Sequence, residues 1–132
     1  MSAPIELLQQ VPLFKSLSRN QLESLAQSFR DRTFAEGAEV TTEGQSGVGF
    51  FLIEDGTATV TVHGEERRTL GPGDYFGEMA LIDDAPRSAT IVADTALRCW
   101  GLTSWEFRPL VETNAAIAWS LLQTLAARLR EQ

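Results

Sequence analysis

The sequence is poor in the residues that build covalent crosslinks, metal centres and nucleic-acid surfaces. It has one cysteine and one histidine among 132 residues, so we expect neither an internal disulfide nor a cluster of histidine ligands. Lysine and arginine number 11 against 18 aspartates and glutamates, for a formal net charge of -7. A nucleic-acid surface needs a basic stripe, which this balance does not supply. We therefore expect no nucleic-acid binding, and a reducing compartment, the cytoplasm.

Long apolar runs are also lacking, and residues 1–6 have neither the basic nor the apolar region of a secretory signal. These features predict no direct contact with a membrane. A length of 132 residues, 43% of them hydrophobic and 22% charged, predicts one domain over residues 1–132 with a buried core. The cysteine, Cys99, lies in an apolar stretch and is expected to be a buried structural thiol.

Helical patterns occupy both ends of the chain, over about residues 4–30 and 104–131. Residues 5–10 predict a short helix, and residues 18–30 an amphipathic one. Ser18 is a candidate N-cap with Gln21 three residues later, the pattern of a capping box. We expect the helix to pack its apolar stripe on the segments that follow.

The C-terminal helices have similar signals. Thr103 and Glu106 form a second capping-box pattern, and Asn114 is expected to separate that helix from a longer one over residues 115–130. The apolar residues that we expect on one broad face of the last helix are Ile117, Ala118, Leu121, Leu122, Leu125 and Leu129. Trp100 and Trp105 are expected to anchor the central region against these helices.

The central region, about residues 32–102, has the pattern of short strands. Residues 50–53 form an apolar run that ends at Asp55 and Gly56, a strong hairpin signal, and residues 57–62 alternate at period two on the way back. Further strand patterns occupy residues 33–34, 39–42, 67–70, 89–93 and 96–102. About eight short strands separated by glycine turns predict a mainly β fold, a jelly-roll β-barrel (double-stranded β-helix) with helices at both ends.

Residues 76–90 carry the most specific pattern. They combine Gly77 and Glu78, an expected short helical turn, and Arg87. The N–H groups that open a helical turn suit an anion, and an arginine adds a planar, bidentate phosphate donor. A carboxylate repels an anion unless it faces hydroxyl groups. A ligand that carries both a phosphate and a ribose satisfies both charged residues.

These residues resemble the phosphate-binding cassette of the cyclic nucleotide-binding domain family. Gly-Glu-Met-Ala-Leu stands at residues 77–81, and Pro-Arg-Ser-Ala-Thr at residues 86–90; the glycine pattern at residues 54–56 and 71–74 matches as well. The family includes bacterial cyclic-AMP receptor transcription factors, protein kinase A regulatory subunits and nucleotide-gated channels. The resemblance covers nearly the whole chain. It implies a 3′,5′-cyclic nucleotide as ligand, cyclic AMP favoured over cyclic GMP, and no other cofactor.

The resemblance also implies a role for each residue of the motif. Glu78 would accept a hydrogen bond from the ribose 2′-hydroxyl, and Arg87 would pair with the cyclic phosphate. The ligand-binding residues that it implies are Phe76, Gly77, Glu78, Met79, Ala80, Arg87, Ser88 and Ala89. In the family, the C-terminal helix caps the base. The polar candidates for that role here are Ser120, Gln123, Thr124 and Arg128.

Two other classes of function compete with a ligand sensor. An enzyme is not expected, because a metal enzyme of this fold needs two or three histidines, and the sequence has only His63, expected at the surface. The alternative is a cyclic-nucleotide-like fold that serves only interaction or dimerisation, with Glu78 and Arg87 merely paired with each other. We favour the sensor, in which the ligand shifts the last two helices. The apolar face of the C-terminal helix could also pair with a second copy in a homodimer; the oligomeric state and the effector are left open.

Overall fold

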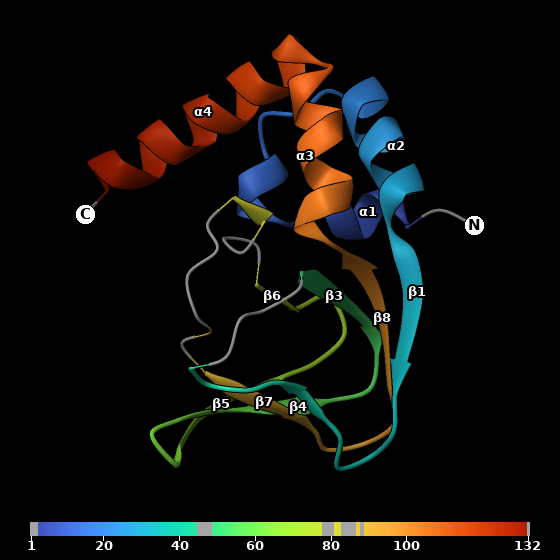
Figure 1. Ribbon diagram of the computed structural model, residues 1–132, viewed down its shortest axis with the longest axis vertical. Coiled ribbons are helices and arrows are strands. Elements are labelled where there is room, and N and C mark those ends of the chain that lie inside the picture. Colours follow the sequence, from blue (N-terminus) through green and yellow to red (C-terminus); the bar gives the residue numbers. More distant parts are fainter. Residues whose placement is uncertain (1–2, 45–48, 78–80, 83–86, 88, 132) are drawn as a thin grey trace.

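The computed structural model describes residues 3–44, 49–77, 81–82, 87 and 89–131. Within these residues, helices stand before and after eight strands (Figure 1). The helices are α1 (Ile5–Leu8), η1 (Pro12–Phe14), α2 (Arg19–Ser28), α3 (Ser104–Glu112) and α4 (Ala115–Arg130). The strands are β1 (Arg30–Phe34), β2 (Glu39–Thr41), β3 (Phe50–Asp55), β4 (Ala58–Val62), β5 (Glu65–Leu70), β6 (Tyr75–Phe76), β7 (Thr90–Ala93) and β8 (Leu97–Leu102).

The strands form two antiparallel sheets of four. One has the order β1-β8-β3-β6 and the other β2-β7-β4-β5. In Figure 1 the helices gather at one end of β1, β3 and β8, while β4, β5 and β7 lie at the opposite end of the molecule. This double-sheet architecture, with helices before and after the strands along the chain, confirms the predicted fold class.

The predicted hairpin at Asp55 and Gly56 is wrong. Strand β3 pairs with β8 and β6, whereas β4 pairs with β5 and β7, so this turn carries the chain from one sheet to the other. Gly56 has φ +96° and sits against the β7–β8 turn, where an added Cβ would lie 3.1 Å from the Leu97 Cα. A local turn signal does not specify whether the strand that follows stays in the same sheet.

The hairpin in this region is β4–β5. His63 and Gly64 both have positive φ, 54° and 77°, the backbone that suits a two-residue hairpin turn. The His63 side chain is 83% exposed, as expected.

The predicted helix starts are confirmed. The Ser18 hydroxyl accepts from the Gln21 N–H, and the Gln21 side chain accepts from the Ser18 N–H. The end of this helix was predicted two residues too late, because α2 ends at Ser28. Phe29 is already extended and fully buried, with its ring against that of Phe50 (centroids 5.9 Å apart). Because the extended backbone at Phe29 places its ring in the core, the helix ends before it and strand β1 begins at the next residue, Arg30.

Strand β3 divides the core into two clusters. Phe50 joins the helices in the first, with Phe14, Phe29 and Phe107, while its neighbour Phe51 lies in the second, between the sheets. The alternation of side chains along a strand produces this division.

Cys99 lies in the cluster between the sheets, fully buried as predicted. Burial raises the pKa of its thiol to about 12, because the apolar surroundings disfavour the thiolate.

Two predictions about the helical layer are corrected. Trp100 is 2% exposed and donates to Glu54 Oε1, but Trp105 is 64% exposed and anchors nothing in the described structure. The broad apolar face of α4 is divided, because Ile117 and Leu121 are buried while Leu122 is 57% and Leu129 70% exposed.

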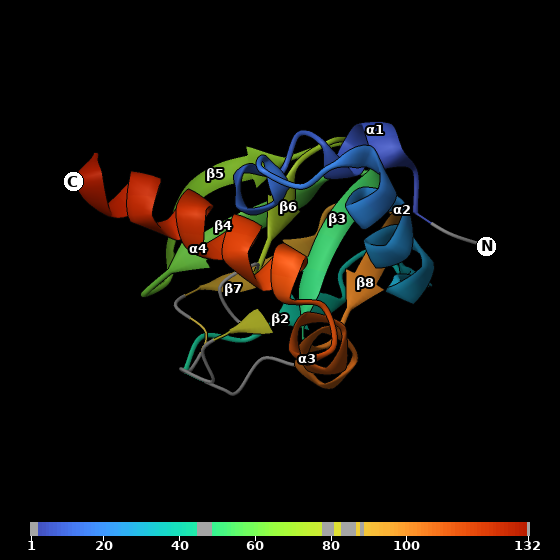
Figure 2. The same cartoon turned by 90° about the horizontal axis from the view of Figure 1, so that it is seen from above.

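Helix α4 contacts the rest of the chain through only part of its circumference. It packs on η1 and α3 and runs outward to the C-terminal end, on the side of the molecule away from the N-terminus (Figure 2). None of the described helices is both long and apolar enough to cross a membrane.

Candidate functional site

The motif of residues 76–90 begins at the end of β6. This two-residue strand pairs with β3, where Phe76 stands opposite Phe51. The ring of Phe76 is 7% exposed and lies 5.4 Å from that of Phe51, centroid to centroid. Phe76 therefore fixes the start of the motif in the core between the sheets. The predicted site residues Glu78, Met79, Ala80 and Ser88 lie outside the described residues.

Among the described residues of the motif, Gly77 and Arg87 lie in direct contact. Gly77 has φ +83°, a backbone conformation that is strained for residues with a side chain. A Cβ at this position would overlap the Arg87 guanidinium and lie 2.6 Å from the Gly49 carbonyl oxygen. The half-buried Arg87 donates through Nη2 to that same carbonyl. Glycine at position 77 is thus required both for its backbone and for the room it leaves to the arginine.

The backbone around Arg87 is held by the last residue of β2 and the turn that follows it. The Gly44 N–H donates to the Arg87 carbonyl (2.8 Å), and the Thr41 hydroxyl donates to the Ala89 carbonyl (3.1 Å). The Glu43 N–H donates to the Thr90 hydroxyl (3.0 Å). Three hydrogen bonds from residues 41–44 therefore hold Arg87, Ala89 and Thr90 in place. Ala89, a predicted site residue, is half-buried here.

Glu43 itself is engaged on its other side. Its carboxylate accepts from the His63 N–H (2.8 Å) and lies 2.9 Å from His63 Nδ1. The β4–β5 turn thereby supports the segment that holds Arg87. No sequence pattern predicted this contact, because it joins residues of two separate turns.

Leu81, in the middle of the motif, packs with the helices. Leu81 is 4% exposed and belongs to the same apolar cluster as Phe107 of α3 and Ile117 of α4. Beside it, Ile82 is 50% exposed. These two residues and α3 together line a cavity of about 410 Å³, whose helical lining comprises Ser104, Trp105, Phe107, Arg108, Val111 and Glu112. Leu81 thus shares one apolar cluster with both C-terminal helices.

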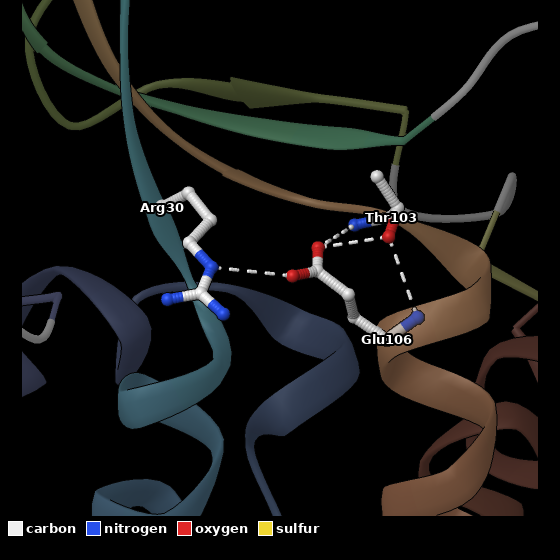
Figure 3. Close-up of polar contacts among 3 residues, drawn as sticks. All are labelled: Arg30, Thr103 and Glu106. Carbon is white, nitrogen blue, oxygen red and sulfur yellow. Dashed lines mark hydrogen bonds and ion pairs between the residues drawn. The ribbon is translucent and has the colours of Figure 1, made fainter.

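The start of α3 is tied to the strands by a polar network (Figure 3). Glu106 Oε1 accepts from the Thr103 N–H (3.1 Å) and hydroxyl (2.8 Å), while Glu106 Oε2 accepts from Arg30 Nε (3.4 Å). Burial alone would raise the pKa of Glu106, but the hydrogen bonds from Thr103 and the Arg30 guanidinium together lower it. The capping box was predicted; Arg30 was not, because its partner lies 76 residues away.

The candidates for a base cap on α4 have different surroundings. Thr124 is 7% exposed, lies 3.1 Å from the Ser16 hydroxyl and donates to the Ser120 carbonyl, so it ties α4 to the loop after η1. Gln123 is exposed and Arg128 half-buried. Among the described residues, no group of three or more histidine, cysteine or acidic side chains is arranged to hold a metal ion.

Two four-stranded sheets, helices at both ends and an arginine seated over a glycine turn are the features of one known class. Residues 31–114 match the family described as "Cyclic nucleotide-binding domain", and the chain belongs to this family. It is 42% identical to a cAMP-dependent protein kinase regulatory subunit of Yarrowia lipolytica over 69% of this chain and 25% of that protein. It is 32% identical to a cGMP-dependent protein kinase of Plasmodium berghei over 80% of this chain and 12% of that protein.

A solved structure supports the same conclusion. The N-terminal domain of a transcriptional regulator from Streptomyces coelicolor A3(2) superposes with a TM-score of 0.87 at 28% identity, covering 95% of this chain and 91% of that one. The chain spans a quarter or less of the two kinase-related proteins. It is therefore similar to one part of each of them.

Proposed function

We propose that the chain is a sensor of a 3′,5′-cyclic nucleotide, with cyclic AMP favoured over cyclic GMP. The observation that carries the proposal is the Arg87 guanidinium, held over Gly77 by the Gly49 carbonyl in a chain of this family. Arginine has five N–H donors, so a bond to Gly49 is compatible with further bonds to a phosphate. A cyclic phosphodiester carries one negative charge, which one arginine matches.

The remaining roles in the proposal follow the motif. Glu78 accepts from the ribose 2′-hydroxyl, and this requirement discriminates against a deoxy sugar. Gly77, Met79 and Ala80 line the turn, and backbone N–H groups there and at Ser88 or Ala89 complete the phosphate site. Phe76 supports the turn from the core. These assignments are predictions for variants to test.

We propose that binding of the ligand changes the positions of α3 and α4, and that this change is the output of the module. Support comes from Leu81, which joins the motif to the apolar cluster of both helices. The ligand shifts these helices only by as much as its affinity differs between their two arrangements. The shift would be detected by an effector within or outside the same polypeptide. We expect the module to work in the cytoplasm, without enzymatic activity and without contacting nucleic acid.

The two relatives support cyclic AMP and cyclic GMP to different degrees. The relative that is 42% identical is named for cAMP, and the one that is 32% identical for cGMP. The higher identity favours cyclic AMP.

Calorimetric titration with cyclic AMP, cyclic GMP and 5′-AMP tests the proposal. We expect cyclic AMP to bind most tightly and 5′-AMP, which lacks the cyclic phosphodiester, to bind weakly. Absence of heat with either cyclic nucleotide at millimolar concentration would refute the sensor function.

A second proposed property is a homodimer through α4, which would also serve a purely interacting module. The exposed apolar residues of this helix, Trp119, Leu122 and Leu129, lie in line with Ala115 and Ala126. The spacing of these five positions alternates between four and three residues, which is the heptad seam of a coiled coil. Two copies that pair along this seam would bury it.

A further inference from the structure

Gly49 lies between Arg87 and the start of α3. Its carbonyl accepts from Arg87 Nη2. Its Cα faces the β8–α3 junction, where an added Cβ would lie 2.5 Å from the Leu102 carbonyl oxygen and 3.4 Å from the Thr103 Cα. The next residue, Phe50, pairs with Leu102 across the sheet. Gly49 is therefore buried between Arg87 on one side and the junction on the other.

The junction that Gly49 contacts also begins α3. Thr103 is the N-cap, whose hydroxyl accepts from the Glu106 N–H at 3.3 Å, and Glu106 is tied in turn to Arg30 (Figure 3). Gly49, Thr103 and Arg30 line one small cavity of about 20 Å³. The backbone of Gly49 thus lies directly against a helix start that has its own hydrogen-bonded network.

We propose that Gly49 is a positioning residue, which aims Arg87 at the ligand phosphate and couples it to the first turn of α3. This proposal rests on the proposed function. Arg87 keeps its bond to the Gly49 carbonyl and presents further donors to the anion. Because residue 49 has no side chain, its backbone rests directly on Leu102 and Thr103. A change in the position of Arg87 therefore reaches α3 without a flexible side chain in between.

The first test is a double-mutant cycle measured by calorimetry with cyclic AMP. In Gly49→Ala the new methyl must push β3 away from the junction, since 2.5 Å is far below ordinary van der Waals contact, and the carbonyl moves with it. We expect about a tenfold loss of affinity in the wild-type background. In an Arg87→Lys background, where the guanidinium is already gone, the same substitution should change affinity by less than about twofold.

Gly71→Ala is the matched control. Gly71 has no positive φ, and an added methyl there would have no atom within 4 Å, so affinity should stay within about twofold of wild type. An equal loss from Gly49→Ala in the two backgrounds would mean that Gly49 acts on the fold and not through Arg87. That result would overturn the inference alone, whereas absence of binding by the wild type would overturn the proposed function.

A second measurement leaves residue 49 intact, in case its alanine variant does not fold. Residues 49–50 form the one Gly-Phe pair in the sequence. Labelling with [1-¹³C]glycine and [¹⁵N]phenylalanine therefore gives a single carbonyl–amide cross-peak. We expect the carbonyl shift to change in Arg87→Ala without ligand, and in the wild type on adding cyclic AMP. A carbonyl that responds to neither would exclude Gly49 as the partner that positions Arg87.

The coupling to α3 is followed at Trp105, the second residue of that helix and 64% exposed. In protein labelled with 5-fluorotryptophan, the ¹⁹F resonance of Trp105, assigned by Trp105→Phe, should move when cyclic AMP saturates the wild type or Gly71→Ala. In ligand-saturated Gly49→Ala, we expect less than about half of that movement. A full movement in this variant would overturn the coupling.

Discussion

At the scale of single residues, Arg87 and Gly77 share one space. The guanidinium occupies the position that a side chain at residue 77 would take, and both groups lie against the Gly49 carbonyl. Sequence identified Arg87 and Gly77, because each has a local signature in the motif. It did not identify Gly49, because the acceptor role of a backbone carbonyl depends on a contact that spans 38 residues.

Removal of the Arg87 guanidinium should weaken ligand binding strongly. A hydrogen bond to a charged group contributes about 1.5–3 kcal/mol, so we expect Arg87→Ala to lower the affinity for cyclic AMP by roughly one to two orders of magnitude in calorimetry. Arg68→Ala, at an exposed position of β5, serves as the control and should bind as the wild type does. Equal affinities for the two variants would refute the assignment of Arg87.

A pair of glycine variants separates backbone strain from crowding at the site. Gly77 and Gly37 have nearly the same φ, +83° and +85°, but only Gly77 has neighbours where a methyl would go. Each alanine variant should lose about 1 kcal/mol of folding free energy in urea denaturation from strain. Gly77→Ala should lose more, and should also bind cyclic AMP more weakly because it displaces Arg87. If Gly37→Ala weakened binding as much, crowding against Arg87 would not be the cause.

At the scale of elements, local signals predicted helix starts well and sheet partners poorly. The capping residues Ser18, Thr103 and Asn114 all cap the expected helices, because a cap is settled within four residues. The prediction that β3 pairs with β4 in a hairpin was wrong. A glycine at a turn fits a corner between two sheets as well as a hairpin. The exposed position of Trp105 was missed for a related reason, as burial on a helix depends on what packs against it.

The charge of Glu106 should stabilise α3 in a pH-dependent way. Its pKa is lower in the folded protein than the ordinary value of 4.5, so its contribution is complete above about pH 4.5 and is lost as the pH falls through the folded value. Glu106→Gln keeps the shape of the capping box, which α2 builds with glutamine, but removes the charge. We expect a loss of about 0.5–1 kcal/mol at pH 7 in denaturant unfolding.

The loss caused by Glu106→Gln should shrink as the pH falls below 4.5, the ordinary pKa of glutamate. Glu112→Gln on the same helix is the comparison. Its i,i+4 pair with Arg108 is exposed and should contribute only about 0.2–0.5 kcal/mol. A difference between wild type and Glu106→Gln that stayed constant from pH 7 to pH 3 would exclude the charge as its source.

At the scale of the whole molecule, the helical layer has one packed side and one exposed seam. The seam of α4 predicts a dimer in sedimentation at micromolar concentrations. Leu122→Glu places a charge in the seam and should give monomers, because a buried unpaired charge is costly. Gln123→Glu, the adjacent exposed position, should leave the dimer intact. A wild type that sediments as a monomer at 100 µM, roughly the upper end of the range where weak pairs associate, would contradict the homodimer.

The burial of Cys99 decides how the proposed movement of α4 can be tested. The sequence has no second cysteine, and a thiol whose pKa is about 12 stays protonated and unreactive in the folded protein. A cysteine introduced at the exposed Gln123 would therefore take up a maleimide spin label alone, without removal of the native thiol. In a dimer, the two labels would report the separation of the paired helices, and its change with ligand, on an otherwise unaltered core.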